Sequence, residues 1–273
     1  MNAVLAGFPE DSYGSVKRLA VFWEWAQPLR ARRAGPLSIL DFGCGTGRGV
    51  SVPLAAAGDT VHGVDAHAPS IEYARRAHGR PNLTFGAETI EDLERRSARF
   101  DVVICSEVLE HLADPGACLR GLRAVLADDG LLFVTVPNGL GAFEILTRVK
   151  RRLDRVGVNQ VLDGALGLAQ KAYRRIRGRV PSAARDDSPF FDDGGHVQFF
   201  RLRRLERLFT EGGWDVVARR GRVVVCGPYA DFWISRLSLC RLNGAIADHL
   251  PLALSADWMF CARPQPEAVG LER

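Results

Sequence analysis

The sequence lacks the features that mark secreted, disulfide-stapled or membrane-spanning chains. None of its six cysteines belongs to a Cys-x-x-Cys pair, so we expect neither a disulfide framework nor a zinc site. No uninterrupted apolar run reaches the length of about 18 residues that a transmembrane helix requires. The segment 1–15 has two acids and no base, which argues against a signal peptide. These absences predict a cytoplasmic protein.

Three glycines at alternate positions, Gly43, Gly45 and Gly47, follow the short apolar run 37–40. The run predicts a buried strand, and the helix-compatible residues 48–57 come after the loop. Glycine adopts positive φ and has no side chain, so the backbone can approach a ligand closely. The next helix directs its first N–H groups at the loop. The sequence therefore predicts a ligand-cradling turn at the carboxyl end of a first strand.

The spacing of these glycines separates two kinds of nucleotide loop. A dinucleotide fingerprint is Gly-x-Gly-x-x-Gly, whereas this loop is Gly-x-Gly-x-Gly preceded by Asp41. A second predicted strand ends in Asp65, about 20 residues beyond the loop, where this type of fold has a ribose-binding carboxylate. Its two oxygens can accept hydrogen bonds from both ribose hydroxyls. The alternative is that Asp65 caps a helix beginning near Ser70.

The loop at 41–47 resembles the first motif of class I S-adenosylmethionine-dependent methyltransferases. From Leu83 to Asn138 the chain resembles the ubiquinone-biosynthesis type of O-methyltransferase, most closely in the fourth predicted strand and the turn after it. The resemblance implies S-adenosylmethionine as the cofactor. It also implies an α/β fold, a Rossmann-like, seven-stranded, mostly parallel sheet with the last strand antiparallel and a helical lid insertion.

The same resemblance implies a set of cofactor contacts at the ends of the first four strands. The set comprises Asp41, Gly43, Cys44, Gly45, Asp65, Ala66, Ala87, Glu88 and Ser106. Ser106 departs from the ubiquinone-type enzymes, which usually have a larger apolar residue there. Glu88 has an alternative as a solvated acid in the first turn of a helix.

Two carboxylates and a histidine after the fourth strand form a candidate metal site. In the resembling enzymes the matching residues can hold a divalent cation; here they are Glu107, Glu110 and His111. This donor set suits a hard or borderline metal, but we do not expect a metal to be bound. His111 and His196 are the candidate catalytic bases, because histidine accepts a proton near neutral pH. The alternative for each is a hydrogen-bonded structural histidine.

The residues between 148 and 179 form a strongly basic insertion. They include ten bases and two acids, a net +8 against +4 for the whole chain. Apolar residues recur at helical spacing over 146–156 and 162–173, which predicts two amphipathic helices, followed by a polar loop over 181–195. The insertion has three open interpretations: a cap with a solvated face, a surface for an anionic membrane, or a site for an anionic acceptor. Scarce aromatic residues disfavour nucleic acid.

We interpret residues 1–273 as a single methyltransferase domain. Its core spans about 36–139 and 196–264, with the insertion at about 140–195, and the apolar stretch 229–254 is expected to wall the acceptor pocket. The predicted reaction is O-methylation of a small-molecule, lipid-linked or glycan hydroxyl, with peripheral membrane contact as an option. Two other classes remain open: a non-catalytic membrane-associated scaffold and a nicotinamide-dependent oxidoreductase.

Overall fold

The computed structural model describes residues 2–157 and 195–266, together with 164, 166–168, 171 and 175 between them. Seven strands form one sheet in the order β3-β2-β1-β4-β5-β7-β6. β7 runs antiparallel between β5 and β6, and the first five strands pair in parallel. The strands are β1 (Ser38–Phe42), β2 (Thr60–Val64), β3 (Leu83–Gly86), β4 (Phe100–Ser106), β5 (Leu126–Pro137), β6 (Trp214–Gly221) and β7 (Asp257–Pro264). The predicted seven-stranded sheet is confirmed.

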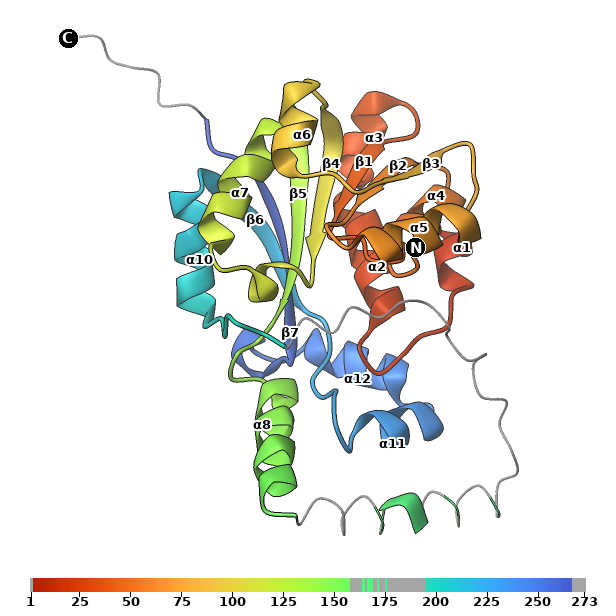
Figure 1. The fold of residues 1–273 in the computed structure, drawn as a ribbon, viewed down its shortest axis with the longest axis vertical. Coiled ribbons are helices and arrows are strands. Elements are labelled where there is room, and N and C mark those ends of the chain that lie inside the picture. The colour runs from red at the N-terminus through yellow and green to blue at the C-terminus, as the bar shows by residue number, and fades with distance from the viewer. Residues whose placement is uncertain are drawn as a thin grey trace, which may run out of the picture.

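Helices cover both faces of this sheet (Figure 1). One face has α2 (Ser15–Trp25), α3 (Gln27–Arg33), α4 (Ser51–Ala56) and α5 (Ala68–Ala77); the other has α6 (Ile90–Arg95), α7 (Pro115–Ala124) and α10 (Leu202–Glu211). The central strands are buried on both sides and are accordingly almost continuously apolar, as in Val102–Cys105 of β4. Two separate apolar clusters result, one on each face of the sheet.

Local sequence signals explain where several helices begin. Thr89 and Asp92 form a reciprocal capping box at the start of α6. Asp114 caps α7, and Pro115 occupies its first turn, where a missing N–H costs nothing. Both helices therefore begin directly beside the ends of β3 and β4, and their preceding loops lie at the edge of the sheet that carries the glycine loop.

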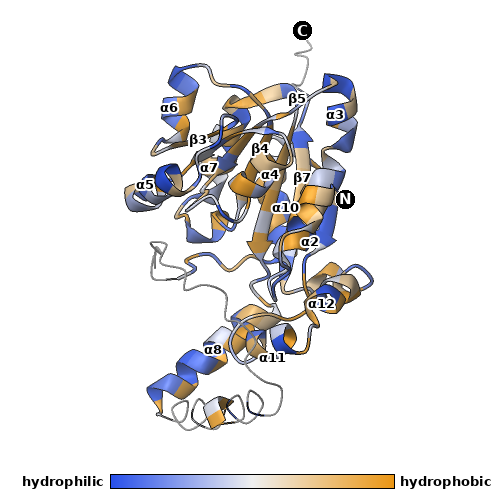
Figure 2. Cartoon of the chain, turned by 90° about the vertical axis from the view of Figure 1, so that its right-hand side faces the viewer, coloured by the Kyte–Doolittle hydropathy of each residue, from blue (hydrophilic) through white to orange (hydrophobic). Residues whose placement is uncertain are grey.

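A second group of elements lies beyond the carboxyl ends of the parallel strands (Figures 1 and 2). It contains α8 (Ala142–Arg155), α11 (Asp231–Arg236), α12 (Cys240–Ala247) and the short helix η2 (Leu252–Leu254). The helix predicted over 146–156 is present as α8. The second predicted helix and the polar loop fall almost wholly outside the described residues, so the lid remains a prediction. Within the described part of the chain, no helix has both the length and the apolar character needed to cross a membrane.

The N-terminal segment contacts both the sheet with its covering helices and the second group of elements. It begins with α1 (Ala3–Ala6), and Leu19 and Phe22 of α2 are buried in the core. The ammonium of Lys17 donates to the carbonyls of Gly221 and Gly244, at 2.9 and 2.6 Å. This segment therefore connects β6 and α12 to the face of the sheet that α2 covers.

Candidate active site

The glycine loop between β1 and α4 is held in a conformation that favours glycine. Gly43, Gly45 and Gly47 have φ values of 74°, 54° and 75°. The N–H groups of Gly43 and Cys44 both donate to the carbonyl of Val64, at 2.8 and 2.9 Å. A Cβ on Gly43 would clash with Val108, whereas a Cβ on Gly45 would meet no atom within 4 Å. The loop is thus packed at its first glycine and open at its second.

Asp65, at the end of β2, holds this loop directly. Its Oδ2 accepts a hydrogen bond of 2.7 Å from the Gly45 N–H, and its Oδ1 accepts one of 2.8 Å from the His67 N–H. His67 is the N-cap of α5, so the carboxylate orders the helix start as well as the loop. Each carboxylate oxygen has a further lone pair. Asp65 therefore still has acceptor capacity for the predicted ribose hydroxyls.

Asp41, the fourth residue of β1, and Cys44, within the loop, are the next two predicted cofactor contacts. Asp41 is buried and accepts a hydrogen bond from the Ser51 hydroxyl at the start of α4. Burial raises the pKa of Asp41 to about 6 and raises the pKa of the Cys44 thiol well above its usual range. Neither residue lines the cavity described next, so the cofactor contacts predicted for them remain predictions.

A cavity of about 760 Å³ lies beside the glycine loop. From the predicted cofactor set it is lined by Gly43, Asp65, Ala66 and Glu88; from the predicted catalytic and metal sets it is lined by Glu107, His111 and His196. Gly45, Ala87 and Ser106 are outside this lining, as is the whole stretch 229–254. Residues predicted for two different tasks therefore share one pocket at the carboxyl ends of the strands, where open α/β sheets bind ligands.

Glu88 is engaged at the rim of this cavity. Its Oε2 lies 2.6 Å from Nε2 of His62 and accepts a hydrogen bond of 2.9 Å from Arg96. It precedes α6, whose N-cap is Thr89. The side chain thus belongs to the turn before the helix, and it is paired with these two residues while it lines the pocket.

Arg18 of α2 reaches the site from the N-terminal segment, and the sequence analysis missed it. Its guanidinium donates to the carbonyl of Gly49, beside the glycine loop, and to the Ser106 hydroxyl at the end of β4, at 3.1 and 3.0 Å. Burial lowers its pKa. Within the described ranges no carboxylate lies within 4 Å of it. A base among the buried residues of an amphipathic helix was the available signal.

Glu107 is held away from the neighbouring histidines. Its Oε1 accepts hydrogen bonds from the Thr135 hydroxyl at 2.6 Å and from Arg222 at 3.1 Å. Arg222 also pairs with Asp257 at 3.2 Å. Burial by itself raises the pKa of Glu107, but the charge of Arg222 and the Thr135 hydroxyl lower it below the ordinary value. Its φ of 59° marks a turn of the chain directly after β4.

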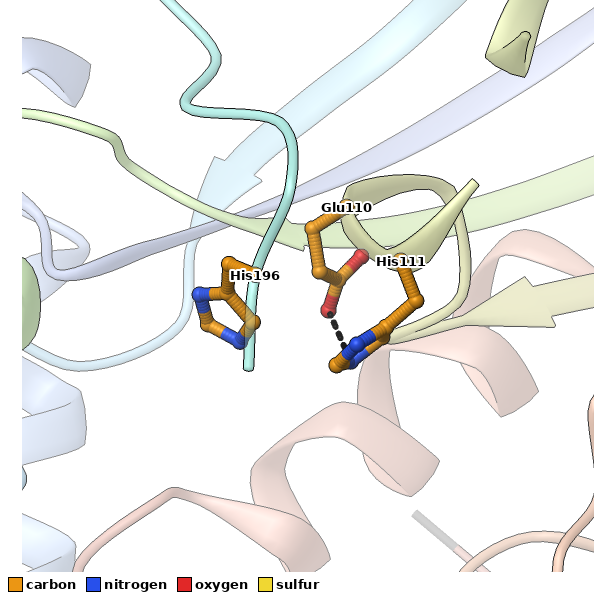
Figure 3. Close-up of side chains that lie close together, drawn as sticks. All are labelled: Glu110, His111 and His196. Carbon is orange, nitrogen blue, oxygen red and sulfur yellow. Dashed lines mark ion pairs between the residues drawn. The ribbon is translucent and has the colours of Figure 1, made fainter. Parts of the chain in front are cut away.

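Glu110, His111 and His196 instead come together (Figure 3), with candidate ligand atoms within 4.8 Å of one another. His111 Nε2 lies 3.8 Å from Glu110 Oε1, and the two imidazole rings are 5.0 Å apart. The Glu110 carboxylate is 1% exposed, and neither of its oxygens has a hydrogen bond among the described residues. Burial, and then the charge of Glu107, raise its pKa well above the usual range. Two members of the predicted metal set thus have His196, not Glu107, as their neighbour.

His196 has a carboxylate partner that the sequence analysis also missed. Its Nδ1 lies 2.5 Å from Oε1 of Glu144, which is 3% exposed in the first turn of α8. The N–H groups of Val197 and Gln198 both donate to the carbonyl of Glu110 at 2.9 Å. These contacts position His196 at the cavity wall. The signal in the sequence was an acid beside Phe143 at the start of an otherwise basic helix.

Comparisons with known proteins agree with this architecture. A family model described as a methyltransferase domain matches residues 17–219. A ubiquinone biosynthesis O-methyltransferase of Chelativorans sp. is 36% identical over 208 residues, which cover 76% of this chain and 69% of that relative. The solved CcbJ methyltransferase of Streptomyces caelestis is 17% identical, with a TM-score of 0.52 over 97% of this chain and 96% of that chain. This last likeness concerns the fold alone.

The chain belongs to the methyltransferase domain family, since the family model covers well over half of it. Its cofactor is therefore S-adenosylmethionine. Another relative, the ubiquinone biosynthesis O-methyltransferase of Actinobacillus pleuropneumoniae, is 37% identical over 108 residues, which are 37% of this chain and 45% of that protein. The chain thus spans under half the length of some curated relatives that it matches.

Proposed function

We propose that this chain transfers a methyl group from S-adenosylmethionine to a hydroxyl oxygen of a small acceptor. The observation that carries the proposal is the shared cavity, which Gly43 and Asp65 line together with the histidine pair His111 and His196. A methyl donor and a proton acceptor are the two components that O-methylation requires. The names of the relatives as O-methyltransferases support the oxygen acceptor.

The residues present fit the methyl donor. Space is open above Gly45, the Asp65 carboxylate has lone pairs available, and Arg18 offers a buried positive charge beside the loop. The cofactor, when bound, supplies a methyl group already activated by a sulfonium. The chain then has to align the acceptor and exclude water, since positioning provides much of the rate in such a transfer.

His196 is the better placed of the two candidate bases. Because Glu144 lies at Nδ1, the imidazole has a defined orientation, which is the arrangement of a carboxylate–histidine pair, and we propose Nε2 as the nitrogen that takes the proton. His111 lines the same cavity and lies against His196. We propose that His196 receives the acceptor proton and that Glu144 stabilises the resulting imidazolium.

A divalent metal, if one binds, would be held by Glu110, His111 and His196, because these three offer converging donor atoms. Its chemistry would be to polarise the acceptor oxygen. The originally predicted ligand Glu107 is instead engaged by Arg222. We expect methyl transfer to survive excess chelator. Loss of activity, with recovery on adding magnesium or zinc, would assign a metal to the site.

The acceptor class that we propose is a small-molecule, lipid-linked or glycan hydroxyl. Ile90, Val108 and Leu112 give the cavity an apolar part of its lining, which suits a partly apolar acceptor. We also propose that the bases of α8 make peripheral contact with an anionic membrane. A lipid-linked acceptor in that membrane would then lie close to the chain.

Calorimetry with S-adenosylhomocysteine and NAD tests the cofactor side of this proposal. We expect S-adenosylhomocysteine to bind and NAD to show no heat of binding, because the third glycine comes one residue too early for a dinucleotide loop. Binding of NAD alone would favour an oxidoreductase. Binding of S-adenosylhomocysteine without any methyl transfer to extracts would favour the non-catalytic scaffold.

A further inference from the structure

Exposed apolar side chains are concentrated at one end of the molecule. Among the described residues, twelve of the fifteen exposed large apolar side chains belong to the segments 140–199 and 237–254. Figures 1 and 2 both show α8, α11 and α12 at the end toward which the parallel strands point. Scattered exposed apolar residues need no explanation, but a concentration of them marks an interaction surface.

α12 has an apolar face that the fold leaves uncovered. Leu239, Leu242 and Ile246 recur at helical spacing and are 37%, 53% and 43% exposed. The neighbouring face is already used: Cys240, Gly244 and Ala247 are buried there. At the boundary between the two faces, the Asn243 side chain accepts the N–H groups of Val224 and Val225, both at 3.1 Å. α12 is therefore fixed to the core by its inner side, and it presents these three residues outward.

α8 adds exposed apolar residues together with positive charge. Ile145 and Val149 are 50% and 42% exposed and alternate with bases; the bases of the helix are Arg148, Lys150, Arg151, Arg152 and Arg155. Its two acids are both engaged, Glu144 with His196 and Asp154 with Lys150. Figure 2 shows α8 as mostly hydrophilic with apolar patches, projecting from the body beside α11.

The charge and the exposed apolar residues together indicate which kind of partner binds the end of the molecule formed by α8, α11 and α12. A second copy of the chain docked on this end would bring a second set of α8 bases near the first, and nearby like charges disfavour association. A nucleic acid would pair with the bases and leave the apolar side chains without a partner. An anionic lipid surface satisfies both, because its headgroups attract the bases and its interior accepts the apolar side chains.

We propose that α12 is a second membrane anchor, so that the docking surface consists of the apolar face of α12 (Leu239, Leu242, Ile246) and the basic helix α8. This extends the membrane contact proposed above for α8. The bases draw the chain to the surface, and the α12 face inserts and fixes its orientation. Because α8 carries Glu144, which contacts His196 at the cavity wall, the docked chain holds its cavity close to the lipid.

Co-sedimentation with vesicles tests this inference. The probes are vesicles of equimolar phosphatidylglycerol and phosphatidylcholine, and vesicles of phosphatidylcholine alone. We expect binding to the anionic vesicles at about 50 mM salt that weakens at about 500 mM, as headgroup attraction is screened. The double change Leu242→Asp with Ile246→Asp should lower vesicle binding by at least about tenfold, since two inserting side chains are lost.

Matched variants separate insertion from other effects. Val217→Asp places the same charge on an exposed apolar residue of β6, outside the proposed face, and should bind vesicles like the wild type. The pair Leu242→Gln with Ile246→Gln repeats the test without added charge, and it covers the case in which the Asp pair fails to fold. Wild-type binding by both α12 pairs would refute the role of α12, as would indifference of the wild type to anionic vesicles.

Two further readouts complete the design. Size-exclusion chromatography without lipid should give the same elution for the wild type and the α12 pairs; a wild-type dimer that the pairs dissociate would assign the face to a second copy and overturn the proposal. Affinity for S-adenosylhomocysteine should be unchanged in every variant. Failure of the wild type to bind S-adenosylhomocysteine would refute the proposed function and leave the vesicle result standing.

Discussion

Asp65 Oδ2 accepts a hydrogen bond of 2.7 Å from the N–H of Gly45, so the acid that ends β2 holds the glycine loop after β1 in place. The two residues follow neighbouring parallel strands, β1 and β2, and the carboxyl ends of these strands meet at the same edge of the sheet. One carboxylate thereby shapes the loop and lines the cavity into which the loop opens.

Replacing Asp65 by Ala should weaken the binding of S-adenosylhomocysteine about 10- to 150-fold. The reason is the loss of a charged hydrogen-bond acceptor, which contributes about 1.5–3 kcal/mol. Titration calorimetry measures this directly. Glu94→Ala, an exposed acid of α6 outside the cavity lining, is the matched control and should bind like the wild type. Unchanged affinity of the Asp65 variant would remove the ribose assignment.

Replacing Arg18 by Met should also weaken S-adenosylhomocysteine, by about 10-fold or more. Arg18 is a buried cation that bridges Gly49 and Ser106, and removing one charged donor costs about 1.5–3 kcal/mol. Arg18→Lys keeps the charge but cannot bridge both partners, so an intermediate affinity is expected. Arg32→Met, on the exposed surface of α3, serves as control. Wild-type affinity in Arg18→Met would reduce the residue to a purely structural role.

Replacing Glu144 by Gln should lower kcat about 10- to 100-fold while KM and cofactor affinity change little. The amide cannot stabilise an imidazolium at His196, and general-base catalysis contributes on the order of 100-fold or more. Glu144→Asp should recover part of the rate. Asp154→Asn removes an exposed acid from the same helix and should leave the rate alone. An equal rate in Glu144→Gln would exclude the pair from the reaction.

Asp41 should make the free energy of unfolding depend on pH between about 4 and 6. Burial raises the pKa of Asp41 in the folded chain to about 6, from an ordinary value of 3.8. The folded state therefore binds this proton more tightly than the unfolded state, and stability falls as pH rises through this window. Two pKa units correspond to about 3 kcal/mol.

Denaturant unfolding of the wild type and Asp41→Asn at several pH values checks this sign. The stability of the wild type relative to the variant should decline by about 3 kcal/mol from pH about 4 to about 7, and then level off. Parallel curves for the wild type and Asp41→Asn would contradict the raised pKa of Asp41.

Sequence patterns predicted the parts of the site that local spacing determines. The loop Gly43–Gly47 and the acid Asp65 belong to consecutive strand ends, so their meeting follows from the βαβ order alone. The sheet and its antiparallel last strand followed from the family resemblance and are confirmed. The predicted catalytic and metal residues share the cavity region, although their roles there remain predictions.

The missed contacts join residues far apart in the chain. Arg18 meets Ser106 across 88 positions, and Arg222 meets Glu107 across 115. No local sequence pattern predicts such a pair, because the two partners lie on different elements. Arg18 belongs to α2, and Arg222 directly follows β6. The electrostatic consequence, Glu107 held by Arg222 and not by the histidines, could be found only once these elements were packed together.

The most direct test of the account is a labelled-methyl transfer assay with the purified chain and cell extract. With S-adenosylmethionine labelled in its methyl group, the wild type should move label into an extract component as a base-stable methyl ether, and Asp65→Ala and Glu144→Gln should move much less. Transfer at equal rates by all three proteins, or no label in any component despite tight binding of S-adenosylhomocysteine, would contradict an O-methyltransferase working through this cavity.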